Sequence, residues 1–316
     1  MTDVLLPERT DHLPTPRGPL SRDVVRILQG HGSIAAADTY ESTGAMDDGD
    51  FQVALWMLQV TEAAGFHDVD DRVGGSLRVR DLRWYLQREF EHGLRRLVAA
   101  PRTGDLASFV DGLRHDVAVD DASPSTPTIE VARLVAKAPY LAWEADPHTL
   151  ALARVEAPLK QAMADIQAGE YGVGFGDTHA TIYRNCLSEL GIGVNEALDR
   201  APSEAFAFAN AAWLFGSDRR LRGAALGQLC MLEMDSVSPC ARAIAAWDHH
   251  GLPAAARRWY DVHVLADEEH DQVIRGQLIP TLHASTPDLV ADAAWGAAVT
   301  NELLRQMTDG ITVATS

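Results

Sequence analysis

Apolar residues recur every three or four positions along most of this chain, and this period constrains its fold more than any other sequence feature. The stretch from Val79 to Ala99 is the clearest case. Its apolar residues include Leu82, Leu86, Phe90, Leu94 and Leu97. Such spacing places the side chains on one stripe of an α-helix. Strand-like alternation is rare in the rest of the chain, so the pattern predicts an all-α fold.

The same period predicts further helices between turn-rich segments. They cover residues 21–30, 51–65, 129–143, 149–170, 178–190, 202–215, 219–235, 239–250, 253–276 and 288–308. Residues 1–19 are rich in proline and lack the period, which predicts a disordered tail. The turn-rich run VAVDDASPSTPT ends at Thr128. It divides a predicted N-terminal helical region, residues 20–128, from a helical bundle over residues 129–316.

Composition excludes several classes of partner. The chain has 27 basic and 45 acidic residues and a net charge of −18, so its field repels nucleic acids and anionic membranes. It has no 18-residue apolar run and no signal-like N-terminus, so we expect neither membrane spanning nor export. Its three cysteines match neither zinc-site nor disulfide spacing. These features together favour a cytoplasmic protein.

The strongest local signal for chemistry lies in the segment WYDVHVLADEEHDQVIRGQL. His263, Asp267 and His270 stand at positions i, i+4 and i+7, within roughly 60° of one another on a helix. Two imidazoles and one carboxylate on a single face suit a non-haem metal centre. The alternative is a solvated acidic face, because Glu268 and Glu269 are neighbours.

Upstream acidic residues offer further candidate ligands. Glu170 and His179 would lie on opposite faces of a continuous helix, but the glycines between them disfavour such a helix. A break can bring the two side chains together, or the glycines can merely join two helices. Glu144 follows an apolar stretch and is either a partly buried carboxylate or a helix-end acid. For Glu233, in an apolar helix, a salt bridge from Arg219, Arg220 or Arg222 is favoured over metal binding.

The order of these residues resembles the ligand set of the haem-oxygenase-like di-iron oxidases, also called iron-containing redox enzymes. The matching residues are Glu144, Glu170, His179, His263, Asp267 and His270. The strings EADPHT, EYGVG, RRLRG, LEMDSVSP and YDVHVLADEEH, with GFHDVDD in the N-terminal half, are similar to those of an actinobacterial branch. The resemblance covers roughly residues 50–300. It does not extend to Glu233 as a ligand.

The resemblance implies a haem-oxygenase-like helical bundle whose six matching residues bind two Fe(II) ions. Dioxygen is then the co-substrate, and an external reductant supplies electrons where the reaction needs them. The expected reaction is oxidation of a small carboxylate-bearing metabolite, derived from an amino acid, by N-oxygenation or oxidative C–C cleavage in specialised metabolism. Two alternatives stay open: a fatty-acid desaturase or decarboxylase of the same fold, and a non-catalytic iron-binding helical protein.

Four residues are candidates for a supporting or substrate-binding role: Glu233, Arg222, Tyr260 and His148. The guanidinium of Arg222 can bind a substrate carboxylate, although an ordinary ion pair is favoured. Tyr260 flanks the ligand helix, where packing is the commoner role of a tyrosine. The expected partner is a small amino-acid-like molecule, and the chain can form a homodimer.

Overall fold

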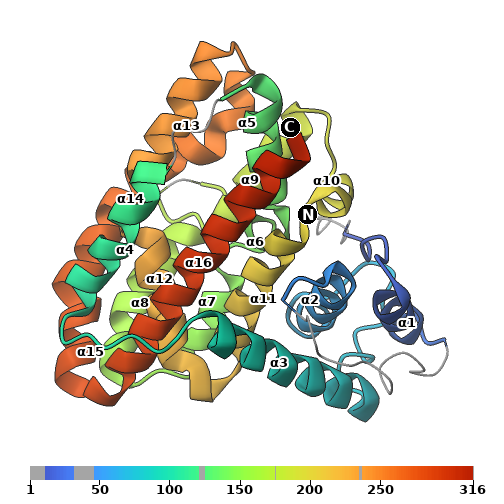
Figure 1. Ribbon diagram of the computed structural model, residues 1–316, viewed down its shortest axis with the longest axis horizontal. Coiled ribbons are helices and arrows are strands. Elements are labelled where there is room, and N and C mark those ends of the chain that lie inside the picture. Colours follow the sequence, from blue (N-terminus) through green and yellow to red (C-terminus); the bar gives the residue numbers. More distant parts are fainter. Residues whose placement is uncertain (1–10, 32–45, 121–124, 175, 235–236, 316) are drawn as a thin grey trace, which may run out of the picture.

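The computed structural model describes residues 11–31, 46–120, 125–174, 176–234 and 237–315. The regular elements in those ranges are helices, without a strand, which confirms the predicted all-α fold (Figure 1). The α-helices are α1 Pro19–Leu28, α2 Gly49–Ala63, α3 Leu77–Leu97, α4 Leu106–Asp120, α5 Pro127–Ala136, α6 Ala138–Leu141, α7 Asp146–Leu152, α8 Ala157–Glu170, α9 His179–Glu189, α10 Val194–Arg200, α11 Ser203–Ser217, α12 Arg222–Glu233, α13 Val237–His249, α14 Arg258–Val273, α15 Ile279–Ser285 and α16 Val290–Thr315. Among the described helices, none combines the length and apolar character needed to cross a membrane.

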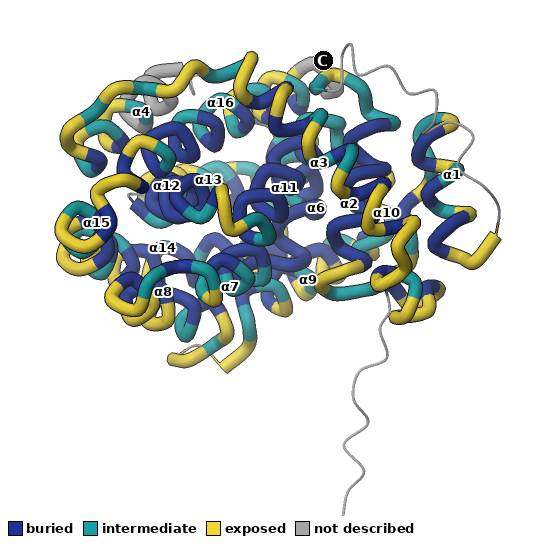
Figure 2. Tube along the Cα trace, turned by 90° about the horizontal axis from the view of Figure 1, so that it is seen from below, coloured by how far each residue is buried: buried dark blue, intermediate teal, exposed yellow. Residues whose placement is uncertain are grey.

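The centre of the bundle consists of helices that are buried on every side. In α11 each residue from Ala205 to Gly216 is buried, and in α12 each residue from Gly223 to Met231. Figure 2 shows α11 and α12 as buried over most of their length. Helix α12 packs directly against α16, where a Cβ atom on Gly227 would overlap the backbone. Small residues therefore let these two helices approach more closely than ordinary side chains allow.

Helix α2 belongs to the same core, although it lies in the predicted N-terminal region. Each of its residues from Phe51 to Thr61 is buried. Gln59 Nε2 donates to Asn210 Oδ1 at 2.9 Å, and Asn210 Nδ2 donates to Gln52 Oε1 at 2.8 Å. These amides satisfy one another between α2 and α11, as buried polar groups must.

The ends of the N-terminal region differ from the sequence-based expectation. Residues 11–18 belong to the predicted tail over residues 1–19, yet they lie against α10. The backbone N–H and the hydroxyl of Thr15 donate to the two carboxylate oxygens of Asp199, at 2.8 and 2.9 Å. Residues 1–10 lie outside the described residues. At the other end, α5 begins at Pro127, just before the predicted boundary at residue 128.

The segment 129–143 forms two helices where one is predicted. Helix α5 ends before Lys137, and α6 begins directly after it. The reason is Pro139, which lacks an N–H and whose ring crowds the carbonyl four residues earlier. Trp56 Nε1 donates to the carbonyl oxygen of Pro139 at 2.9 Å and ties the break to α2. Lys137, at this break, and Glu144 both lie on the wall of one cavity.

Candidate metal centre

Helix α14 presents three ligand-type side chains to the interior of the bundle. His263, Asp267 and His270 have exposed fractions of only 6, 2 and 5%. Their neighbours Glu268 and Glu269 are exposed. The solvated acidic face is therefore the opposite side of this helix, and it does not include the three candidate ligands.

Glu170 and His179 meet across a glycine-rich loop. Glu170 is the last residue of α8, and His179 is the first residue of α9. In the loop Gly172 has a φ of +92°, a conformation that glycine adopts without strain. His179 Nδ1 lies 3.0 Å from Glu170 Oε2. The glycines thus join two helices, and the break also brings the two side chains together.

Glu144 extends from the tight turn between α6 and α7. The next residue, Ala145, has a φ of +76°, which is strained for a residue with a Cβ atom. Glu144 Oε2 accepts a hydrogen bond from Trp259 Nε1 at 2.7 Å, and Glu144 Oε1 lies 3.5 Å from His263 Nε2. The carboxylate is therefore buried and points at α14.

These side chains converge in two groups of ligand-type atoms. Within each group the nitrogen and oxygen atoms lie within 4.8 Å of one another. One group consists of Glu144, Glu170, His179 and His263, and the other of Glu170, Glu233 and His270. Glu170 belongs to both groups. Asp267 is outside both groups as described, but its Oδ1 lies 3.7 Å from His270 Nδ1.

The partner predicted for Glu233 is wrong. Instead of an arginine, His270 contacts it, with Nδ1 2.8 Å from Glu233 Oε2. The three arginines pair elsewhere: Arg219 and Arg222 with Glu156, and Arg220 with Glu91 and Asp218. Arg222 begins α12 and Glu233 ends it, so the two side chains start roughly 16 Å apart along the helix. At that separation Glu233 is too far from the arginines to pair with them. Arg222 is likewise too far from the candidate metal centre to take part in it.

The electrostatics of the cluster suit a bound cation. Burial, together with the charges of Glu233 and Glu144, raises the pKa of Glu170 well above its ordinary value. Its Oε1 atom is buried and accepts no hydrogen bond from the part of the chain that the structure describes. Burial opposes protonation of His263, yet the nearby Glu144 and Asp267 charges raise its pKa well above the usual range. Crowded carboxylates in a dry site are what a divalent cation neutralises, so these residues fit iron.

Trp259 orients the first group, although the sequence analysis did not select it. His263 Nδ1 lies 2.8 Å from the carbonyl oxygen of Trp259, which leaves Nε2 to face Glu144. The indole ring also lies against the imidazole, with centroids 3.7 Å apart. A carbonyl that holds one ring nitrogen leaves the other free to bind metal. The sequence signal that could have identified Trp259 was its position, because it stands four residues before His263 on the same helix face.

Comparison with known protein families agrees with this geometry. The family model described as iron-containing redox enzyme matches residues 132–305, more than half of the chain. The chain belongs to the iron-containing redox enzyme family. The matched region contains both groups of ligand-type residues. No curated protein matches the chain.

The other two predicted supporting residues lie near the cluster but outside it. His148 is buried on α7, and burial lowers its pKa to about 4 against the opposing charge of Glu233. Tyr260 is buried on α14, where its ring packs against Trp259 and Trp247. The Tyr260 ring also faces the Lys137 ammonium group, whose Nζ lies 5.0 Å from the ring centroid.

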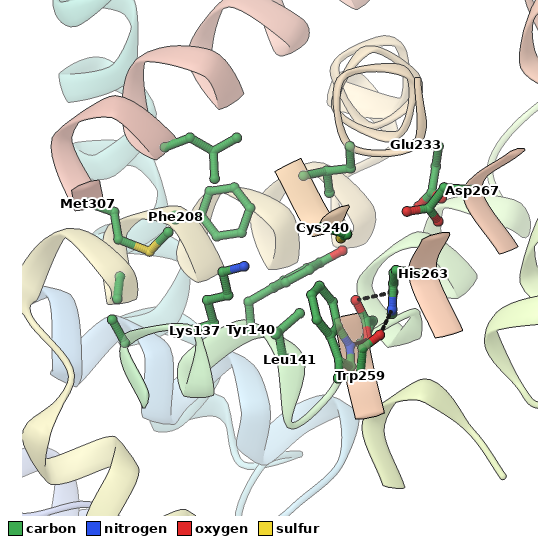
Figure 3. Close-up of a pocket in the computed structure, with 15 residues that line it drawn as sticks. Lys137, Tyr140, Leu141, Phe208, Glu233, Cys240, Trp259, His263, Asp267 and Met307 are labelled. Atoms are coloured by element: carbon green, nitrogen blue, oxygen red, sulfur yellow. Dashed lines mark hydrogen bonds and ion pairs between the residues drawn. The ribbon is translucent and has the colours of Figure 1, made fainter. Parts of the chain in front are cut away.

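A cavity of about 110 Å³ adjoins these ligand-type residues. Glu144, Glu233, His263 and Asp267 form part of its wall. The remaining lining residues are mostly apolar: Ala136, Leu141, Ala205, Phe208, Leu232, Trp259, Leu304 and Met307, with Lys137, Tyr140 and Cys240. Figure 3 shows Phe208 and Met307 on the side away from His263, with Lys137 and Tyr140 between. The cavity thus connects an apolar wall to the candidate metal centre.

Proposed function

We propose that this chain binds two ferrous ions and uses dioxygen to oxidise a small carboxylate-bearing metabolite, derived from an amino acid. The observation that carries the proposal is the pair of ligand groups that share the buried Glu170. One ion would be held by Glu144, Glu170, His179 and His263. The other would be held by Glu170, Glu233 and His270, with Asp267 completing the ligands beside His270.

The donor set favours iron over softer metals. Carboxylates with imidazoles suit iron or manganese, whereas thiolates select zinc or copper. No cysteine belongs to either group of described residues. Glu144, Glu170, Glu233 and Asp267 provide four negative charges, which balance two divalent ions in a buried site.

In this proposal the protein positions the ions and protects the site from water. Two ferrous ions, when bound, supply the electrons that reduce dioxygen. The Trp259 carbonyl oxygen holds His263 in the orientation that points Nε2 inward, and the Trp259 indole N–H holds Glu144. The rings of Tyr140 and Phe208 lie edge to face at 5.1 Å and close the apolar side of the cavity. A substrate in the cavity therefore lies beside the ligands in a largely dry space.

The size of the cavity favours a small substrate over a fatty acid. A space of about 110 Å³ is close to the roughly 150 Å³ that accommodates a benzene molecule. A long acyl chain needs several times that volume. The cavity also favours an oxidase over an iron store, because storage needs no apolar substrate space beside the ions. N-oxygenation and oxidative C–C cleavage both remain within the proposal.

Anaerobic titration with ferrous iron tests the proposal. We expect saturation at two ions per chain, followed by oxygen consumption that depends on added substrate. Glu170→Gln should lose binding at both positions, whereas Glu189→Gln, an exposed residue on α9, should bind as the wild type does. A wild-type protein that takes up no iron, or a bound zinc ion that iron does not displace, would contradict the proposal. If the protein takes up iron but its oxygen consumption does not depend on any added substrate, the result would favour an iron-storage protein.

A further inference from the structure

Lys137 is a cation in an unusual place. The chain has 27 basic residues, yet its only lysines are Lys137 and Lys160. Lys160 is exposed on α8. Lys137 lines the cavity beside the candidate metal centre, and in Figure 3 its ammonium group points into that space.

The contacts of the Lys137 ammonium group are aromatic rather than ionic. Its Nζ lies 5.0 Å from the ring centroid of Trp259 and 5.0 Å from that of Tyr260. Among the described residues, no carboxylate forms an ion pair with it. Burial lowers its pKa, and the nearby Cys240 and Glu144 side chains only partly oppose this effect. The face of an aromatic ring stabilises a cation less than a carboxylate in contact with it would. The positive charge of Lys137 is therefore poorly compensated by its surroundings.

The charges around the cavity also point to an anion. The ionisable acids on its wall are Glu144, Glu233 and Asp267, and all belong to or adjoin the candidate ligand groups. Two divalent ions balance these acids together with Glu170. Lys137 then remains the one uncompensated charge on the described cavity wall.

We propose that Lys137 binds the carboxylate of the substrate inside this cavity. The assignment rests on the proposed function and specifies how the substrate is held. Trp259 sets the distance between the bound carboxylate and the metal ligands, because its ring contacts both the Lys137 ammonium group and the His263 imidazole. The carboxylate is therefore held about one aromatic ring away from the ligand atoms. The rest of the molecule is left to face Glu144 and His263.

This placement defines a ligand class. The ligand carries one anionic group and is small enough for a cavity of about 110 Å³. Lys137 replaces the surface arginines as the carboxylate-binding group. Arg219, Arg220 and Arg222 are paired with Glu156, Glu91 and Asp218.

Binding of butyrate and of its neutral isostere butyramide tests the assignment. Both are titrated anaerobically into the iron-loaded protein by calorimetry, and the iron content of each sample is measured. We expect butyrate to bind the wild type about tenfold or more tightly than butyramide, as a charge-assisted contact implies. Lys137→Met should remove that preference, and Lys137→Arg should retain most of it. Lys160→Met is the matched control and should behave as the wild type.

The possible results separate the two proposals. Butyrate binding that is equal in Lys137→Met and wild type, at equal iron content, would overturn the Lys137 assignment and leave the iron proposal standing. The Lys137 assignment would also be overturned if the wild type bound butyrate and butyramide equally, or did not bind butyrate. This result needs only the wild-type protein, so it does not depend on whether a variant folds. A wild type that holds no iron would instead contradict the proposed function.

Discussion

At the scale of single residues, Glu170 connects the two halves of the candidate metal centre. Its carboxylate lies 3.0 Å from His179 Nδ1 through Oε2 and 3.6 Å from His270 Nδ1 through Oε1. Each oxygen thus faces a different group of ligand-type atoms. Glu233 belongs only to the second group, in which it contacts His270.

This difference predicts different iron stoichiometries for two variants. Glu233→Ala should lower iron content from two ions to about one per chain, because it removes a ligand from one group only. Glu170→Ala should lower it toward zero, because it removes a ligand from both. The metal-free Glu170→Ala protein should melt at or above the wild-type temperature, since the substitution relieves repulsion with Glu233 and Glu144. Metal analysis and calorimetry of the same samples measure both effects. Two ions retained by Glu233→Ala would show that this residue is not a ligand.

At the scale of elements, the site depends on how closely α8 approaches α14. Gly169 lies one residue before Glu170 in α8, and a Cβ atom there would lie 2.8 Å from His270 Nε2. No side chain other than hydrogen fits without moving that imidazole. The contact between His270 and Glu233 at 2.8 Å depends on the same position of the ring.

Gly169→Ala should therefore lower iron binding with little effect on folding. The added methyl group displaces His270, whereas the free energy of unfolding changes by less than about 1 kcal/mol because alanine is the better helix former. Gly112→Ala is the matched control: a methyl group added to this exposed glycine of α4 would meet no heavy atom within 4 Å among the described residues apart from the backbone of its own helix and its neighbours in the chain. The control should gain about 0.5–1 kcal/mol and keep its iron. Full iron content in Gly169→Ala would mean that the second group tolerates a shifted imidazole.

At the scale of the whole molecule, α2 joins the N-terminal region to the bundle. Its buried contacts with α11 include the amides of Gln52, Gln59 and Asn210, and Trp56 reaches the α6 segment that precedes Glu144. The core is continuous across the predicted boundary at residue 128. Helix α2 therefore supports the segment that precedes Glu144.

Asn210→Ala should destabilise the whole molecule in one step. The substitution removes the buried hydrogen bonds that Asn210 forms with Gln52 Oε1 and Gln59 Nε2, which costs about 2–3 kcal/mol. Thermal melting followed by circular dichroism should show a single transition at lower temperature, because α2 and α11 share one core. Gln161→Ala, at an exposed position of α8, should leave the melting temperature unchanged. An early transition confined to part of the chain would indicate that the two regions unfold separately.

The sequence by itself determined the features that depend on local geometry. The apolar period predicted the all-α fold, and the spacing of His263, Asp267 and His270 placed them on one face of α14, because helical geometry repeats over a few residues. The glycines after Glu170 indicated a break for the same local reason. The order of the acidic residues and histidines was enough to indicate the family.

Only the tertiary structure decided which distant residues meet. Contacts between Glu144 and Trp259, or between Glu233 and His270, join segments more than 30 residues apart, and they depend on how the helices pack. Helical period does not encode those packing positions, so an arginine appeared the better partner for Glu233. The same holds for Lys137, which lines the cavity together with residues from segments far away in the sequence, such as Phe208 and Trp259. Local spacing thus set which faces the side chains share, and helix packing set which of those faces touch.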